Sequence, residues 1–234
     1  MIIRENTLKV QDVYGDLSLS QENKDLKPEK MIFFDLEHYV YKKPKCIGVF
    51  GACVFNNQTN TLEVTQYMIE NKNEAIDILV LAYSYFVKMK KEGKDTIVTF
   101  SGNNDFSVIN YLFKENNIEY DFDKEYNSLD IQKEYEKRRK KSIGLKNLEK
   151  QFNIVRETEV ISGSNLAKTF QKVMKDKDYI SRMPREKIDK ILFYNEQDVV
   201  NLYHIFVNWE EYIEIEYEPI KIEQEEIIID EQWF

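Results

Sequence analysis

The sequence predicts an α/β protein whose mixed sheet starts as an antiparallel meander, continues with parallel strands and is flanked by helices. Two observations lead to this fold class. Three apolar, strand-like segments follow one another between residues 31 and 69 without an intervening helical pattern. Beyond residue 70, helical and strand-like patterns alternate, which is typical of parallel strands joined by helical crossovers.

The meander is predicted from local residue types. The apolar run Met31-Ile32-Phe33-Phe34 opens the first strand, which we expect to end near Leu36. The second and third strands are expected at residues 46–55 and 62–69. Between them, Asn56-Asn57-Gln58-Thr59-Asn60 is a cluster of turn-forming residues, so the two strands should form a hairpin.

The alternating part begins with a helix from about residue 74 to 91. Asn73 is its expected N-cap and Gly93 its expected stop. The remaining predicted elements are, in order, a strand at 96–100, a helix at 104–115, a strand near 129–131, and helices at 143–152, 164–175 and 184–208.

Length and composition predict one main domain with two extensions. The chain has 234 residues, and its 4 prolines and 7 glycines are too few for a fibrous or low-complexity protein. We expect an N-terminal extension at 1–30, the main domain at 31–208 and an acidic extension at 209–234, where a period of two from Tyr212 onward predicts strand. We expect this tail and the strand-like positions of residues 1–19 to pair with each other or with the domain's edge.

The charge balance and the cysteines narrow the class of protein. A formal charge of −9 argues against a nucleic-acid coat protein but not against a nuclease, because a metal site needs carboxylates.

The longest apolar run, residues 75–87, is too short to span a membrane, and the N-terminus lacks the apolar region of a signal peptide. Cys46 and Cys53 fit neither a metal-ligand spacing nor a disulfide framework, so we expect a reducing, cytoplasmic compartment.

Two carboxylates mark the first strand. Asp35 and Glu37 lie two residues apart, so they share one face of the strand, about 6.6 Å apart along it. The strand is apolar enough to be covered on both faces, and burying two unpaired carboxylates there is costly. A cleft that holds cations would relieve this cost. The alternative is that both residues mark the solvated end of the strand.

Two further aspartates follow later elements. Asp198 lies on the last long helix in one stripe with Tyr194 and Leu202, and no Lys or Arg nearby in the sequence offers it a partner. Asp105 follows the fourth strand at the start of a helix. Taken singly, Asp198 could lie at the margin of a buried face and Asp105 could be a first-turn acid.

Together, the carboxylates predict a metal site. The places where they fall can converge on one crevice of an open α/β sheet. Clusters of oxygen ligands suit hard cations such as Mg²⁺ or Mn²⁺. Two such ions about 4 Å apart support in-line displacement at a phosphoryl group.

The same residues carry a resemblance to a known family. In order, three motifs resemble those of the DEDD (DnaQ-like) exonucleases: Asp35-Leu36-Glu37, Asp105, and Tyr194-Asn195-Glu196-Gln197-Asp198. The spacing of the last motif is similar to that of the tyrosine subclass. Two further segments, Ser128-Leu129-Asp130 and Leu145-Lys146-Asn147-Leu148-Glu149, look most like a bacterial family of predicted exonucleases. The resemblance covers about residues 31–208.

The resemblance implies a ribonuclease-H-like fold and a metal-dependent 3′→5′ exonuclease that hydrolyses phosphodiester bonds at the 3′ end of single-stranded DNA or RNA. Asp35, Glu37, Asp105 and Asp198 would hold two Mg²⁺ or Mn²⁺ ions, and Tyr194 would orient the attacking water. Two alternatives stay open, namely a non-catalytic nucleic-acid-binding or scaffold module on the same fold and a structure-specific endonuclease.

Other residues are candidates for contact with a nucleic-acid strand. A dense basic run, Lys137-Arg138-Arg139-Lys140-Lys141, is either a contact to the phosphate backbone or the solvated end of a helix. Tyr39 and Phe106 are neighbours of the motif residues and could stack on a terminal base, although most aromatic residues should belong to the core.

Overall fold

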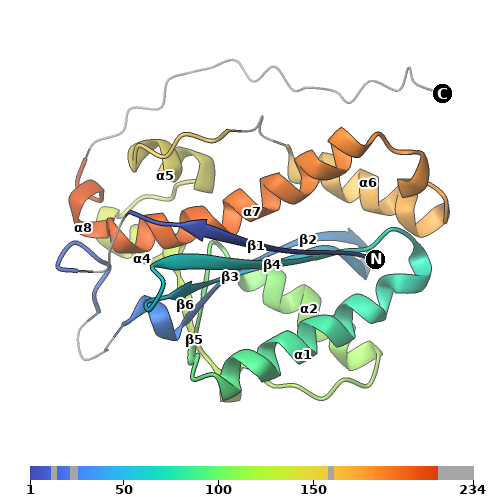
Figure 1. Ribbon diagram of the computed structural model, residues 1–234, viewed down its shortest axis with the longest axis horizontal. Helices are drawn as coiled ribbons and strands as arrows, with labels where there is room; N and C mark the ends of the chain where they lie inside the picture. The colour runs from blue at the N-terminus through green and yellow to red at the C-terminus, as the bar shows by residue number, and fades with distance from the viewer. Residues whose placement is uncertain (12–14, 22–25, 158–160, 216–234) are drawn as a thin grey trace.

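The structure, a computed structural model, describes residues 1–11, 15–21, 26–157 and 161–215. Its centre is a six-stranded sheet in the order β1-β4-β3-β2-β5-β6 (Figure 1). The strands are β1 (Ile2–Lys9), β2 (Met31–Tyr41), β3 (Lys43–Asn56), β4 (Thr61–Met68), β5 (Thr96–Thr99) and β6 (Asn127–Asp130). β1, β4, β3 and β2 pair antiparallel, whereas β2, β5 and β6 pair parallel. The predicted mixed sheet is therefore confirmed.

Helices cover both faces of this sheet, with α1 and α2 on one side and α7 on the other, where α5 also lies (Figure 1). α6 packs directly against β2. The helices are α1 (Asp77–Lys91), α2 (Asn103–Glu115), α3 (Phe122–Glu125), α4 (Ile131–Arg139), α5 (Leu145–Gln151), α6 (Gly163–Lys175), α7 (Arg185–Val207) and α8 (Trp209–Tyr212). Short 3₁₀ turns add Pro28–Lys30, Lys72–Ala75 and Ile180–Arg182. Among the described residues, no helix combines the length and the apolar composition that crossing a membrane requires.

β2 is buried on both faces, as its apolar sequence predicts. The ring of Phe33 meets that of Tyr203 on α7 at 5.6 Å between centroids. Phe34, which points to the opposite face, meets Phe86 on α1 at 5.4 Å. Because side chains alternate along a strand, Asp35 and Glu37 share the face of Phe33 and point toward α7.

The local predictions differ from the structure at several elements, and α3, for example, was not predicted. β2 continues past Leu36 to Tyr41, because β3 pairs with it from Phe33 to Tyr41. Asn71 rather than Asn73 caps the turn before α1, since its side chain accepts a hydrogen bond from the Asn73 amide. α4 was absent from the predicted elements, although the basic run at its end was considered as a possible helix end. Its sequence is strongly charged, and its buried side chains are those of Ile131 and Tyr135.

The N-terminal extension forms the expected edge strand, whereas the start of the C-terminal extension is helical. β1 pairs with β4 along its whole length, from Ile2 opposite Met68 to Lys9 opposite Thr61, so this part of the N-terminal segment closes the sheet's edge as expected. Residues 209–212 form a helical turn, α8, and not part of a strand. The rest of the predicted β-type tail, residues 216–234, lies outside the described residues.

Candidate metal centre

Three of the four candidate carboxylates meet between β2 and α7. Asp35, Glu37 and Asp198 each offer an oxygen atom, and these atoms all lie within 4.8 Å of one another. Glu37 and Asp198 are buried, and Asp35 is partly buried. Their convergence follows from two local patterns, the period of two along β2 and the helical stripe of α7.

The opening for this cluster comes from the neighbouring strand. β5 pairs with β2 only as far as Val98 opposite Phe33 and ends at Thr99, so Asp35 extends beyond its parallel partner. The register with β3 shifts between Glu37 and His38, which marks a bulge of the kind that often adjoins active sites. We expected the carboxylates at the end of their own strand, but the strand that ends beside them is β5.

A chain of buried amides fixes Asp35. Asn195 on α7 donates from Nδ2 to Asp35 Oδ2 at 3.1 Å. Gln66 on β4, fully buried, donates from Nε2 to Asn195 Oδ1 at 2.8 Å and to the Leu192 carbonyl at 2.7 Å. Gly51 lies opposite Asp35 on β3, and a Cβ atom there would stand 2.1 Å from Asn195 Oδ1. The glycine therefore leaves room for the amide that orients Asp35.

The electrostatics of the cluster favour a bound cation. Burial, followed by the charge of Asp198, raises the pKa of Asp35 to about 7. Burial and the charge of Asp35 raise the pKa of Glu37 well above its ordinary value. Carboxylates this close repel one another when all are ionised, and a cation bound between them removes this repulsion. The all-oxygen donor set and its repulsion thus fit hard divalent ions such as Mg²⁺ or Mn²⁺.

Asp105 lies beside this cluster but outside its group of three. It occupies the first turn of α2 and is buried. Burial and the charge of Asp35 raise the pKa of Asp105 well above its ordinary value. Its Oδ1 is 3.9 Å from Nε2 of His38, which follows Glu37 on β2. The structure therefore brings Asp105 into electrostatic contact with the other carboxylates.

The turn before Asp105 is held by a residue from the next strand. Asp130, at the end of β6, accepts hydrogen bonds at 3.0 Å from the amides of Ser101 and Gln132. The first bond steadies Ser101, whose φ of 56° is uncommon for a residue other than glycine. The second caps α4. Asp130 thus links the start of α2 to α4.

Sequence reasoning missed the partners of Asp198. Lys146 on α5 and Arg156, in the segment that follows α5, both form ion pairs with its Oδ1. They precede Asp198 by 52 and 42 residues, so a search of the neighbouring sequence could not find them. Arg156 is also held by Glu149, whose Oε2 accepts from its Nε at 2.7 Å. Asn201 on α7 donates to Glu149 Oε1 at 3.0 Å.

Tyr194 lies one helical turn before Asp198 and is buried. The Lys146 ammonium lies 4.4 Å from its ring centroid, and the Arg156 guanidinium 5.1 Å. Burial and the charges of Asp198 and Glu37 raise the pKa of Tyr194. The phenol therefore stays protonated at neutral pH, which suits orienting a water molecule better than accepting a proton.

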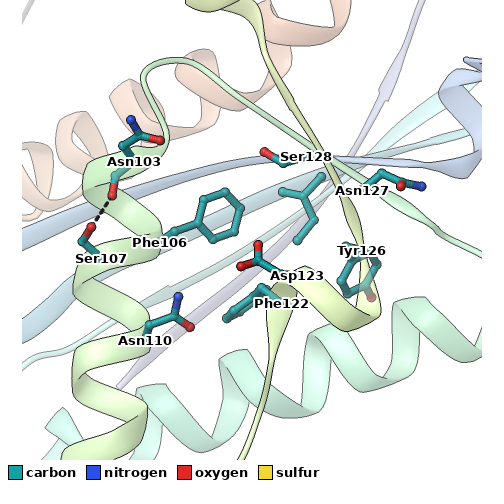
Figure 2. A pocket seen from close by; sticks show the side chains of 10 residues that line it. Asn103, Phe106, Ser107, Asn110, Phe122, Asp123, Tyr126, Asn127 and Ser128 are labelled. Carbon is teal, nitrogen blue, oxygen red and sulfur yellow. Dashed lines mark hydrogen bonds between the residues drawn. The ribbon is translucent and has the colours of Figure 1, made fainter. Parts of the chain in front are cut away.

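The two candidate aromatic contacts lie in different surroundings. The Tyr39 hydroxyl accepts a hydrogen bond from Gln171 Nε2 on α6 at 2.9 Å. Phe106 points into a cavity of about 440 Å³ between α2 and the segment of α3 and β6 (Figure 2). Its ring also packs against Phe34 at 6.2 Å and Phe122 at 5.5 Å. The lining residues of this cavity are Ile97, Asn103, Phe106, Ser107, Asn110, Phe122, Asp123, Tyr126, Asn127 and Ser128.

The basic run forms the end of α4 and meets acidic residues near the end of the described chain. Arg138 pairs with Glu210 at 3.2 Å and also with Glu214. Arg139 pairs with Glu214 at 2.7 Å. Lys140 takes the left-handed C-cap position of α4, and Lys141 is exposed. Both arginines therefore already form ion pairs with carboxylates of the protein itself.

Comparison with known proteins agrees with this geometry. A sequence profile of the RNase H superfamily matches residues 32–210, which include the whole sheet apart from β1 and all the candidate carboxylates. A search of curated proteins found no match. The profile spans well over half of the chain, and its boundaries agree with the sheet and helices that form the centre. The chain therefore belongs to the RNase H superfamily.

Proposed function

We propose that this protein is a metal-dependent 3′→5′ exonuclease that acts on the 3′ end of single-stranded DNA or RNA. The observation that carries this proposal is the meeting of Asp35, Glu37 and Asp198 within 4.8 Å, on a chain whose superfamily typically hydrolyses phosphodiester bonds. The motif order and the Tyr194–Asp198 spacing support the exonuclease assignment. The free, buried thiols of Cys46 and Cys53 fit the reducing, cytoplasmic compartment that we propose for it.

In this proposal the residues of the centre have distinct tasks. Asp35, Glu37, Asp198 and, from α2, Asp105 would hold two Mg²⁺ or Mn²⁺ ions. Such ions, when bound, activate a water molecule and stabilise the leaving oxygen. Tyr194, as a neutral phenol, would donate or accept one hydrogen bond and so orient that water.

Substitution of one metal-holding carboxylate tests this proposal. We expect Asp35→Asn and Asp198→Asn to lose nearly all hydrolysis of a labelled single strand, and excess EDTA to abolish the activity of the parent. Asp189→Asn is the matched control, because Asp189 lies on α7 too, has a half-exposed side chain and pairs with Arg185 at 3.4 Å, away from the cluster. Full activity in EDTA would contradict a metal-dependent reaction.

The label's position separates the alternatives. A 3′→5′ exonuclease converts a 5′-labelled strand into a descending ladder and releases a 3′ label at once as a mononucleotide. A structure-specific endonuclease instead yields discrete internal fragments that depend on the folded form of the substrate. A non-catalytic module binds the strand, leaves both labels intact and responds to neither metal nor the two substitutions.

A further inference from the structure

Two cations meet one carboxylate oxygen at this centre, but only one of them is fixed. Arg156 and Lys146 both pair with Oδ1 of Asp198. The Arg156 side chain is 7% exposed and is also bound to Glu149, whereas the Lys146 side chain is 26% exposed. Arg156 therefore has a permanent anionic partner, and Lys146 depends on Asp198.

A count of charges shows what Lys146 could neutralise. Glu149 compensates Arg156, so this pair adds no net charge. If the proposed function holds, the charge of two divalent ions equals that of the four carboxylates. A phosphodiester then brings one further negative charge, and the ammonium group of Lys146 is the remaining cation in contact with the described cluster.

The position of Lys146 suits such a contact. Its Nζ lies 4.4 Å from the centroid of Tyr194, the residue proposed to orient water, and it reaches the cluster from the first turn of α5. A lysine side chain is a flexible arm with a compact charge, and it can turn without movement of the backbone. With Asp198 bound to a metal ion, the ammonium group would lose this partner and could turn toward a phosphate group at the cluster.

We propose that Lys146 is a catalytic residue that pairs with Asp198 in the metal-free protein and binds a non-bridging oxygen of the substrate's phosphodiester when metal is present. This inference rests on the proposed function and adds a substrate contact to it. No covalent bond forms at Lys146. The ammonium group exchanges one anionic oxygen, that of Asp198, for another.

The proposal predicts effects of opposite sign on metal and on substrate. Lys146 competes with a divalent ion for Asp198, so its removal should tighten metal binding. It also contacts the phosphodiester, so its removal should weaken catalysis. A residue that only supports the structure of the site would weaken both.

The experiment compares Lys146→Met with Lys146→Arg and with a matched control, Lys150→Met. Lys150 lies on α5 as well, one turn later and exposed, so its substitution removes the same charge from the same helix. Mn²⁺ binding without substrate is measured by EPR titration, and kcat and KM are measured on a short labelled strand. The folded state of each variant is checked by circular dichroism, with Lys146→Gln as a second neutral variant.

For Lys146→Met we expect Mn²⁺ to bind about three- to tenfold more tightly and kcat/KM to fall about ten- to hundredfold, the range of a charge-assisted hydrogen bond. Lys146→Arg should recover most of kcat/KM, and Lys150→Met should match the parent in both quantities. An unchanged or raised kcat/KM in Lys146→Met and Lys146→Gln would overturn the proposal, as would weaker Mn²⁺ binding.

Failure of this inference can be told from failure of the proposed function. If the parent hydrolyses the strand, Asp198→Asn does not, and the Lys146 variants match the parent, Lys146 has no such role while the proposed function stands. If the parent neither hydrolyses a strand nor loses Mn²⁺ binding on substitution of Asp198, the proposed function itself is wrong.

Discussion

The carboxyl group of Asp35 illustrates how burial and repulsion act at one residue. Its hydrogen bond from Asn195 and the positive charges of Lys146 and Arg156 favour the ionised form. Burial and the charge of Asp198 act in the opposite direction and outweigh them, which raises the pKa of Asp35 to about 7. In the metal-free protein this carboxyl group is therefore a source of instability at neutral pH.

The sign of this shift predicts how stability changes with pH. An ordinary aspartate has a pKa of about 3.9, so the folded state binds more protons than the unfolded state between about pH 4 and 7. The free energy of unfolding in EDTA should then fall as the pH rises through this window. Asp35→Asn, which cannot ionise, should show a smaller fall. Thermal unfolding at pH 5 and pH 7.5 measures the difference, and parallel slopes for parent and variant would contradict it.

A second prediction at this scale concerns Gly51. Gly51→Ala would bring a methyl group within 2.1 Å of Asn195 Oδ1, so the amide must move and leave Gln66 or Asp35 without its partner. A buried polar group without a partner costs about 1–3 kcal/mol, and we expect a loss of this size in urea unfolding. Gly163→Ala is the control, because nothing lies within 4 Å of its Cβ position. Equal stability of the two variants would show that the amide chain adapts.

At the scale of elements, the strands and long helices were predictable because their patterns are local. β3, β4 and α7 follow runs of apolar residues with periods that a sequence reveals directly. α4 escaped because Ile131 and Tyr135 are its buried residues in an otherwise charged segment. Local patterns cannot show which elements, far apart in the sequence, pack against one another.

In the candidate metal centre, too, some features were predictable from local patterns and others depend on tertiary packing. The shared face of Asp35 and Glu37 was predictable from the alternation of side chains along a strand, and the position of Asp198 on a buried face from its stripe on a helix. Its ion pairs with Lys146 and Arg156 were not, because they depend on the place where the segment around α5 packs against α7. Charge partners separated by more than 40 residues leave no periodic signal in a single sequence.

The ion pairs between α4 and the end of the chain lead to a prediction about the basic run. Arg138 and Arg139 are paired with Glu210 and Glu214, so their charges are less available to a phosphate backbone. We expect the variant Arg138→Ala/Arg139→Ala to lose at most about 1 kcal/mol of stability per pair, as surface ion pairs do.

For the same variant, we expect the slope of the logarithm of the strand-binding constant against the logarithm of salt concentration to stay close to that of the parent. Fluorescence anisotropy over a range of salt concentrations measures this dependence. A slope flatter by about 1 to 1.5 would instead assign two phosphate contacts to these arginines, at about 0.7 per contact.

For the molecule as a whole, the centre lies where the two halves of the sheet meet. β2 pairs antiparallel with β3 on one side and parallel with β5 on the other, and β5 ends beside Asp35. In open α/β sheets, ligands commonly bind in crevices just beyond the carboxyl ends of parallel strands, and β5 ends at Thr99 beside β2. The site therefore joins β2 and α7, which lie in different layers and share the core.

This placement predicts that a bound metal stabilises the whole domain. An ion held by residues of β2 and α7 binds the folded state and not the unfolded chain, so it should add about 2.7 kcal/mol when its concentration is a hundred times its dissociation constant. We expect Mg²⁺ to raise the Tm of the parent and of Asp189→Asn, but not that of a variant carrying both Asp35→Asn and Asp198→Asn. Because the chain has a formal charge of −9, added salt alone can stabilise it by screening, so NaCl at the same ionic strength is the necessary comparison. A Tm rise that NaCl reproduces in full, or one that persists in the double variant, would place the effect on the general surface charge and not on the carboxylates between β2 and α7.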